Sequence, residues 1–306
     1  MKKIFGKKFV LFTCMAAVLF LFSCGDKPAA EETPETPETP AEQEPVESEE
    51  TPETPAYTIT APDGKEGTIT RSEDGKTITL QPEETDVEYT ITGEFEGQII
   101  NKTKGTVIIL KNAKLKNTKG KAAIYGELKT VIKCEENTTN TITVTGEADK
   151  TYGKAAVLCE KAIEIGGDGS CTISCENGHG VKGDDVELKG KGNYVFGPAK
   201  DSAINCNDFE VKADKTFTAT FKDAKNGIKA DNTITIASGT FIYENIKNAA
   251  LKTDTSADDA AGKTKEHKIT LEGGTFTFTN CGSKYSTEEG AFTKSDTITS
   301  DFTNPL

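Results

Sequence analysis

A short pattern of small, apolar and polar residues returns at regular intervals along most of the chain. The hexapeptides HGVKGD (179–184), NGIKAD (226–231) and AALKTD (249–254) are examples, each with one apolar residue after a small one and an acid at the end. These central apolar residues, called marker residues below, lie 33, 24, 23, 24 and 23 positions apart and are Ile124, Val157, Val181, Ile204, Ile228 and Leu251. A period of this length predicts stacked repeat units, with a polar insertion in the longer first interval.

Between the marker residues, apolar positions alternate with polar ones. Ile163 and Ile165 form one such pair, and Phe217, Ala219 and Phe221 form another after a turn. Alternation with a period of two predicts strands that bury one face, and no helical pattern separates them. We therefore predict an all-β parallel β-helix, an open single-stranded solenoid with three short strands per coil of about 23 residues. The leucine-rich consensus and the repeated glycine-aspartate calcium motif that would favour other solenoids are missing.

The pattern also predicts the domain organisation. Residues 57–104 have strand composition without the full repeat, which is typical of a capping β segment at the amino-terminal end of the coils. The coils are expected at 105–281, and the polar residues 282–306 are expected to form a carboxy-terminal cap or tail.

The amino terminus predicts export and a lipid anchor. Four lysines precede an apolar stretch that ends in LFSC, and this arrangement is typical of a signal peptide at 1–23 followed by a lipidated Cys24. An uncleaved amino-terminal anchor is the alternative. Both interpretations place the body in the cell envelope outside the cytoplasm, either at the outer surface or in the periplasm.

Residues 24–56 are expected to be a disordered stalk. The segment 26–56 contains seven of the eleven prolines, eleven acids and one lysine, a composition that cannot form a core and favours extension. The body at 57–306 is acidic as well, with 38 acidic and 31 basic residues. Because no basic stripe dominates, nucleic acid is not an expected partner.

Three segments carry a resemblance to a known family. YTITGEFEGQIIN (89–101), the NGIKAD type of unit and LKTDTSADDAAGKTKEHKITLEGGTFTFTN (251–280) resemble a bacterial carbohydrate-binding β-helix family whose characterised relative binds acidic plant polysaccharide. The resemblance covers about 85–281. It implies a right-handed, pectate-lyase-like fold, bound calcium and polygalacturonate-like ligands. The chain departs from the family two residues before each marker residue, where the usual Asp is replaced by Ala122, Ala155, His179, Ser202, Asn226 and Ala249.

Acids and amides recur three and four residues after the marker residues. Stacked like charges destabilise a sheet unless something compensates them, and calcium prefers carboxylate and amide oxygens as ligands. Turn chemistry with salt bridges explains the same residues, since Asn and Asp favour bends. The candidate metal ligands are Asp184, Asp185, Asn207, Asp208, Asp231, Asn232, Asp254, Asp258 and Asp259.

Lysines follow the marker residues directly and are candidate ligand-binding residues. Lys182, Lys229 and Lys252 can neutralise Asp184, Asp231 and Asp254 respectively, or contact the carboxylates of a uronic acid chain. Tyr125 is the tyrosine expected to face outward and offer a sugar-binding ring, and the chain contains no Trp.

No catalytic residue is predicted. His179 and His267 are the only histidines and are expected at the surface or in turns, and the single arginine, Arg71, precedes the coils. The favoured function is non-catalytic binding of a polysaccharide, expected to be acidic and to involve calcium, by a monomeric lipoprotein. The alternatives are a calcium-dependent polysaccharide lyase and an adhesin for a host protein.

Overall fold

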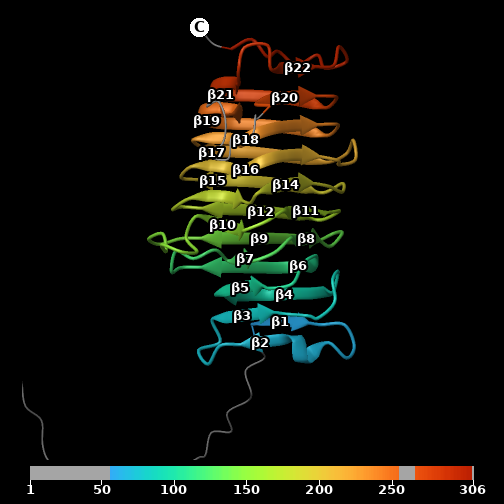
Figure 1. Cartoon of the computed structure of the whole chain (residues 1–306), viewed down its shortest axis with the longest axis vertical. Helices are drawn as coiled ribbons and strands as arrows, with labels where there is room; N and C mark the ends of the chain where they lie inside the picture. Colours follow the sequence, from blue (N-terminus) through green and yellow to red (C-terminus); the bar gives the residue numbers. More distant parts are fainter. Residues whose placement is uncertain (1–55, 255–265, 305–306) are drawn as a thin grey trace, which may run out of the picture. The chain divides into compact units, whose positions relative to one another are not determined.

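The computed structural model describes residues 56–254 and 266–304, which fold as stacked β-strands. Figure 1 shows the strands following one another along the stack, from β2 in blue to β22 in red. A single turn of 3-10 helix, η1 (Glu66–Thr68), is present in the described part of the chain. The chain is therefore all-β, as predicted.

The strands that begin at the hexapeptides form the first face of the stack. Each pairs in parallel with the strand of the next repeat, so Val157 lies opposite Ile124 on one side and Val181 on the other. The marker residues form one continuous row inside the protein. This face contains β3 (Thr77–Leu80), β5 (Gln98–Asn101), β7 (Ile124–Gly126), β10 (Ala155–Cys159), β13 (His179–Lys182) and parts of β16 (Ser202–Val211), β18 (Asn226–Ile236), β19 (Thr240–Thr253) and β21 (Thr275–Ser286).

The other two faces repeat the same arrangement. The second face contains parts of β4 (Glu88–Glu96) and β6 (Thr106–Asn117), then β8 (Thr130–Cys134), β11 (Ile163–Gly167), β14 (Asp185–Leu188), parts of β16 and β18, β20 (Lys268–Leu271) and β22 (Phe292–Lys294). The third face contains β9 (Thr139–Val144), β12 (Ser170–Cys175), β15 (Asn193–Ala199), β17 (Thr218–Ala224) and parts of β4, β6, β19 and β21 (Thr275–Ser286).

The amino-terminal end is paired differently from the rest. β1 (Tyr57–Thr60) runs antiparallel to β4, and β2 (Ile69–Arg71) runs antiparallel to β3. All other strand pairs of the described residues are parallel. These reversals end the parallel stack at this side. At the other side the pairing continues beyond residue 281, because β22 pairs with β20.

The prediction of an open right-handed β-helix with three separate short strands per coil is wrong, because the strand pairing closes on itself. Eleven parallel strands form a complete ring of hydrogen-bonded neighbours, so their pairing is that of an eleven-strand parallel β-barrel. The remaining strands pair outside this ring. The ring runs β6, β8, β11, β14, β16, β18, β19, β17, β15, β12, β9 and back to β6.

Long strands that turn corners cause this closure. β19 contributes to the third face at its start and to the first face at its end, so one strand joins two faces. At this corner Asp223, Asn245 and Asn280 all have positive φ (50°, 55° and 53°), a conformation that Asn and Asp tolerate better than other side chains. Their side chains stack, with each Asn amide donating to the residue below at 2.9 Å. The bend therefore does not interrupt the pairing.

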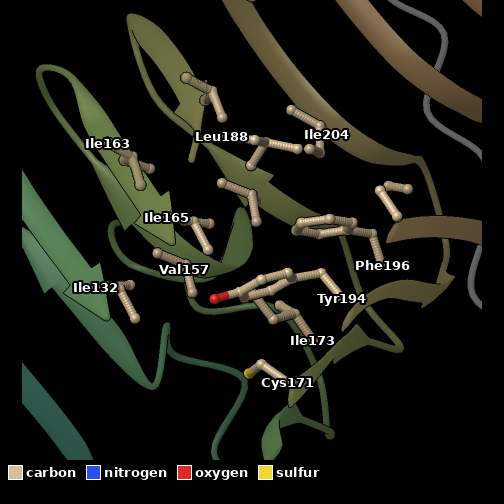
Figure 2. Close-up of a cluster of buried hydrophobic side chains, with 14 of the residues drawn as sticks. Ile132, Val157, Ile163, Ile165, Cys171, Ile173, Leu188, Tyr194, Phe196 and Ile204 are labelled. Atoms are coloured by element: carbon tan, nitrogen blue, oxygen red, sulfur yellow. The ribbon is translucent and has the colours of Figure 1, made fainter. Parts of the chain in front are cut away.

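The core lies between the three faces. Figure 2 shows Val157 of the first face, Ile132 of the second, and Ile173, Tyr194 and Phe196 of the third pointing into the same interior. Towards the carboxy terminus the third face fills the interior with stacked rings, whose centroids lie 4.8–5.3 Å apart through Phe196, Phe221, Tyr243 and Phe278. Burial of these side chains supplies the main favourable free energy of folding.

Candidate functional site

The residue after each marker residue belongs to a row on the outer side of the first face, called the outer row here. Its members occupy paired positions of successive strands, which lie about 4.8 Å apart. The amino-terminal half is apolar, and the carboxy-terminal half consists of lysines, one asparagine and a final serine. In order, the outer row is Ile100, Tyr125, Leu158, Lys182, Asn205, Lys229, Lys252 and Ser286.

The apolar half is covered by the polar insertion of the first repeat. Tyr152 packs edge-on against Tyr125, with ring centroids 4.8 Å apart, and its backbone carbonyl accepts a hydrogen bond from the amide of Ala122 at 2.7 Å. The Asp149 carboxylate holds this turn by accepting from two backbone amides, those of Thr151 and Tyr152. A small apolar cluster therefore forms outside the main core, made of Ala122, Tyr125, Ala155 and Leu158 with Ile100 and Tyr152 against it.

Tyr125 does face outward, but its ring is not open to a ligand. The side chain is only 9% exposed, and its hydroxyl donates to Glu160 at 3.3 Å. Burial and the nearby Glu160 carboxylate raise the pKa of Tyr125 to about 12. The expectation of an open sugar-binding ring at Tyr125 is therefore corrected by the packing of Tyr152.

The basic half of the outer row borders an open groove, called the basic groove below. Its volume is about 390 Å³, and four of its ten lining residues are lysines. Asp201 is the one acid among them, so the groove is positive although the body as a whole is acidic. The lining residues are His179, Lys182, Asp201, Ser202, Asn205, Lys225, Asn226, Lys229, Asn248 and Lys252.

The lysines of the groove differ in their partners. Lys229 contacts Asp231 at 3.1 Å, as the sequence predicts, and lies 4.0 Å from Asp254. Lys182 does not pair with Asp184, because Lys161 contacts that carboxylate instead at 3.7 Å. Across residues 56–254 and 266–304, neither Lys182 nor Lys252 forms an ion pair.

A column of polar side chains lies beside the lysines, two residues before the marker residues. The backbone amide of Ser202 donates to His179 Nδ1 at 3.1 Å, and Asn226 Nδ2 donates to Ser202 Oγ at 3.1 Å. Among the described residues, Asn226 Oδ1 has no hydrogen-bond partner. Sequence reasoning did not select these three residues for the site. The signal was present, since this position is Ala122 and Ala155 in the covered half but His179, Ser202 and Asn226 in the first three repeats of the open half, before it returns to Ala249.

The candidate metal ligands gather where the first face turns into the second, but on two sides of that corner. Asp184, Asn207 and Asp231 border a hollow of the first face. Asp185 and Asp208 lie opposite one another on the second face. Burial, followed by the charges of Asp208 and Asp184, raises the pKa of Asp185.

One of these carboxylates is already engaged in hydrogen bonds. Asp208 Oδ1 already accepts hydrogen bonds from Asn232 Nδ2 at 2.8 Å and from the amide and hydroxyl of Thr233. Among the described residues, no group of three or more His, Cys, Asp or Glu side chains is placed to hold a metal. The calcium site stays a prediction that melting with and without calcium would test.

The second face also carries acids, and lysines neutralise them. Glu164, Glu187 and Glu210 occupy paired positions of successive strands. Lys189 bridges the first two at 3.1 Å each, and Lys212 contacts Glu187 at 3.4 Å and Glu210 at 2.6 Å. This face is therefore internally balanced, unlike the basic groove.

The second histidine is not a surface residue. His267 is 2% exposed, and neither ring nitrogen has a hydrogen-bond partner within the described residues. Its Nε2 lies 4.0 Å from Glu288 Oε1. His267 does not border the basic groove.

Several predicted features lie outside the described residues. They are the signal peptide at 1–23, Cys24, the stalk up to residue 55, and Asp258 and Asp259. In the part of the chain that is described, no helix has the length and apolarity needed to cross a membrane.

Comparison with known proteins supports carbohydrate recognition. Residues 74–302 match the family described as carbohydrate-binding domain-containing protein. A solved structure, the polysaccharide lyase-like protein from C. thermocellum in its gadolinium derivative, is 19% identical with a TM-score of 0.53. The match covers 74% of this chain and 93% of that one, and at this identity it shows a shared fold alone. No curated protein matches the chain. Since the family match spans most of the chain, including the whole basic groove, the protein belongs to the carbohydrate-binding domain-containing family.

Proposed function

We propose that this protein binds an acidic polysaccharide without cleaving it, and that the polymer lies along the outer row over the basic groove. The observation that carries the proposal is the pair Lys182 and Lys252, which form no ion pair within the described residues and border one open groove of a carbohydrate-binding domain-containing protein. Lysines that form no internal ion pair are available to the carboxylates of a ligand.

The spacing of the lysines suits a polymer that runs along the stack. Lys182 and Lys229 are two strand steps apart, about 9.6 Å, and Lys252 follows one step later at about 4.8 Å. Asn205 lies between them, and Asn248 borders the same groove. Their amides offer donors and acceptors for sugar hydroxyls. Charge and amide recognition takes the place of the aromatic faces that the covered Tyr125 cannot provide.

A binding assay with a matched uncharged polymer tests this function. Purified protein is expected to be retained by immobilised polygalacturonate at low salt and not by dextran, and retention is expected to fall as salt screens the lysines. Equal retention on both polymers, or none on either, would contradict acidic polysaccharide binding. Repeating the assay with calcium and with a chelator shows whether calcium contributes.

Catalysis is the second candidate, because the polysaccharide lyase-like protein shares the fold. A lyase would convert polygalacturonate to unsaturated products that absorb in the ultraviolet. We expect none, since the lone pair of His179 Nδ1, the histidine that borders the groove, is already engaged by the Ser202 amide. Absorbing products formed by wild type and lost in His179→Ala and Lys182→Ala would establish the lyase instead.

We further propose that Cys24 carries a lipid that holds the protein in the cell envelope. A tether of this kind depends on acyl chains attached to one thiol. Cys24→Ala is therefore expected to move the protein from the membrane fraction to the soluble fraction of cells, measured by immunoblot after fractionation. Continued membrane association of a variant with a processed amino terminus would exclude the thiol as the anchor.

A further inference from the structure

His179 stands in the basic groove as a residue that neither the lysine row nor the family match explains. It opens β13, three residues before Lys182, and its ring borders the groove together with Ser202 and Asn226. The sequence has only one other histidine, and that one is buried elsewhere.

The hydrogen bond to Ser202 fixes the form of the His179 ring. A nitrogen that accepts a hydrogen bond from a backbone N–H carries no proton itself, so the neutral ring must hold its proton on Nε2. The amide of Ser202 is part of β16, where Ser202 pairs with Asn226 of the next strand, so this donor cannot turn away. Within the described residues Nε2 has no hydrogen-bond partner.

The charges around the ring keep it neutral. Burial is the main cause that lowers the pKa of His179 to about 4; the charges of Lys182 and Lys229 act in the same direction, and Asp201 opposes them. Lys225 and Lys252 border the same groove and add positive charge. Near neutral pH the ring therefore presents an uncharged N–H beside a row of ammonium groups.

We propose that His179 is a ligand-contacting residue of the basic groove, held by the Ser202 amide as the Nε2–H tautomer and donating that proton in a hydrogen bond to an oxygen of the bound polysaccharide. This inference rests on the proposed function and names one subsite within it. The lysines attract carboxylates over a distance, whereas a fixed neutral donor requires an acceptor oxygen at one position. His179 thus contributes to the choice of sugar and not only to the attraction of charge.

Two substitutions test the acceptor role of Nδ1 and the donor role of Nε2 separately. In His179→Asn, the amide oxygen can replace Nδ1 as acceptor for Ser202 while the donor at the Nε2 position is lost. In His179→Gln, the longer side chain can place an N–H near the Nε2 position. We expect His179→Asn to keep the melting temperature of wild type and to weaken polygalacturonate binding about five- to tenfold, the loss of one hydrogen bond to a charged or polar ligand. His179→Gln should bind better than His179→Asn and melt lower.

A measurement on the free protein tests the tautomer independently of binding. Nitrogen-15 spectra of the histidine rings in the full chain should show His179 with an unprotonated Nδ1 and a protonated Nε2 from pH 5 to pH 8, with His179→Asn assigning the signals. A proton on Nδ1, or a doubly protonated ring at pH 6, would overturn the inference.

The binding outcomes distinguish this inference from the proposed function. If wild type binds polygalacturonate and His179→Asn binds equally well, the subsite is wrong and the lysine groove stands. If wild type binds no acidic polysaccharide, the proposed function is wrong and the donor role of His179 falls with it.

Discussion

The two halves of the outer row occupy equivalent positions on one face, but one half is covered and apolar and the other is open and basic. In the amino-terminal half, Tyr125 and Leu158 are covered by Tyr152 and extend the hydrophobic packing outside the core. In the carboxy-terminal half, Lys182, Asn205 and Lys252 stay open and border the basic groove. The backbone pairing is the same in both. Function on a repeated face is thus decided by what covers a position and not by the repeat itself.

The insertion between the first two marker residues makes the difference. It supplies Tyr152 and the Asp149 turn, and Ala122 and Ala155 leave room for the added ring. Further along the chain the corresponding positions are His179, Ser202 and Asn226, and no segment among the described residues covers them as Tyr152 covers Tyr125. One half of the face therefore extends the hydrophobic packing, and the other borders the groove that we propose as the binding site.

The largest effect is expected from a change that both halves share. Val181 is fully buried in the marker row. Val181→Asp would place an unpaired carboxylate in that core and is expected to cost about 3–5 kcal/mol of the free energy of unfolding. Chemical denaturation measures the loss, and Val181→Ile is the apolar control. A variant with wild-type stability would mean that the marker residue does not face the core.

The half proposed to bind should respond to loss of Lys182 and Lys252, which form no ion pair within the described residues. Lys182→Ala with Lys252→Ala is expected to weaken polygalacturonate binding about a hundredfold, roughly tenfold for each charged contact, with little change in melting temperature. Lys212→Ala is the matched control, because Lys212 is engaged with Glu187 and Glu210 on another face. Equal losses from both variants would show that net charge, and not the groove, attracts the polymer.

A substitution in the covered half should lower the free energy of unfolding without changing polysaccharide binding. Tyr152→Ala removes an edge-to-face ring contact and uncovers Tyr125 and Leu158, which is expected to cost about 1–2 kcal/mol of the free energy of unfolding. Polygalacturonate affinity should stay unchanged, as measured by calorimetry. A gain of affinity for neutral sugars in this variant would show that the insertion hides a latent aromatic subsite.

The smallest effect is a difference in pH dependence between wild type and His179→Asn. The pKa of His179 is about 4 in the folded protein, against an ordinary value of 6.5. Between these two pH values the ring is therefore protonated in the unfolded chain and neutral in the folded one. The contribution of the neutral His179 ring to the free energy of unfolding is fully present above pH 6.5 and is lost as the pH falls towards 4. Melting temperatures across this range should therefore drop more steeply for wild type. Parallel curves would mean that the ring is not held neutral.

The site could be predicted from the sequence only in part. Lys182, Lys229 and Lys252 were selected because they follow the marker residues, and all three do border one groove. The pairing of Lys182 with Asp184 was wrong, because Asp184 lies at a corner within reach of Lys161 from the neighbouring coil. His179 and Asn226 were missed, since their roles depend on partners 23 and 24 residues away.

By itself, the amino-acid sequence determined the all-β class, the period and the inward row from Ile124 to Leu251, because alternating hydrophobicity and a constant spacing report which side chains must leave water. The tertiary structure alone decided how the strands join and which outer positions stay open. Closure into a ring depends on the stacked Asp223, Asn245 and Asn280, which bend the backbone without ending its hydrogen bonds. The covering of Tyr125 and the fixed proton of His179 likewise depend on contacts between repeats, and a pattern along one strand carries no information about them.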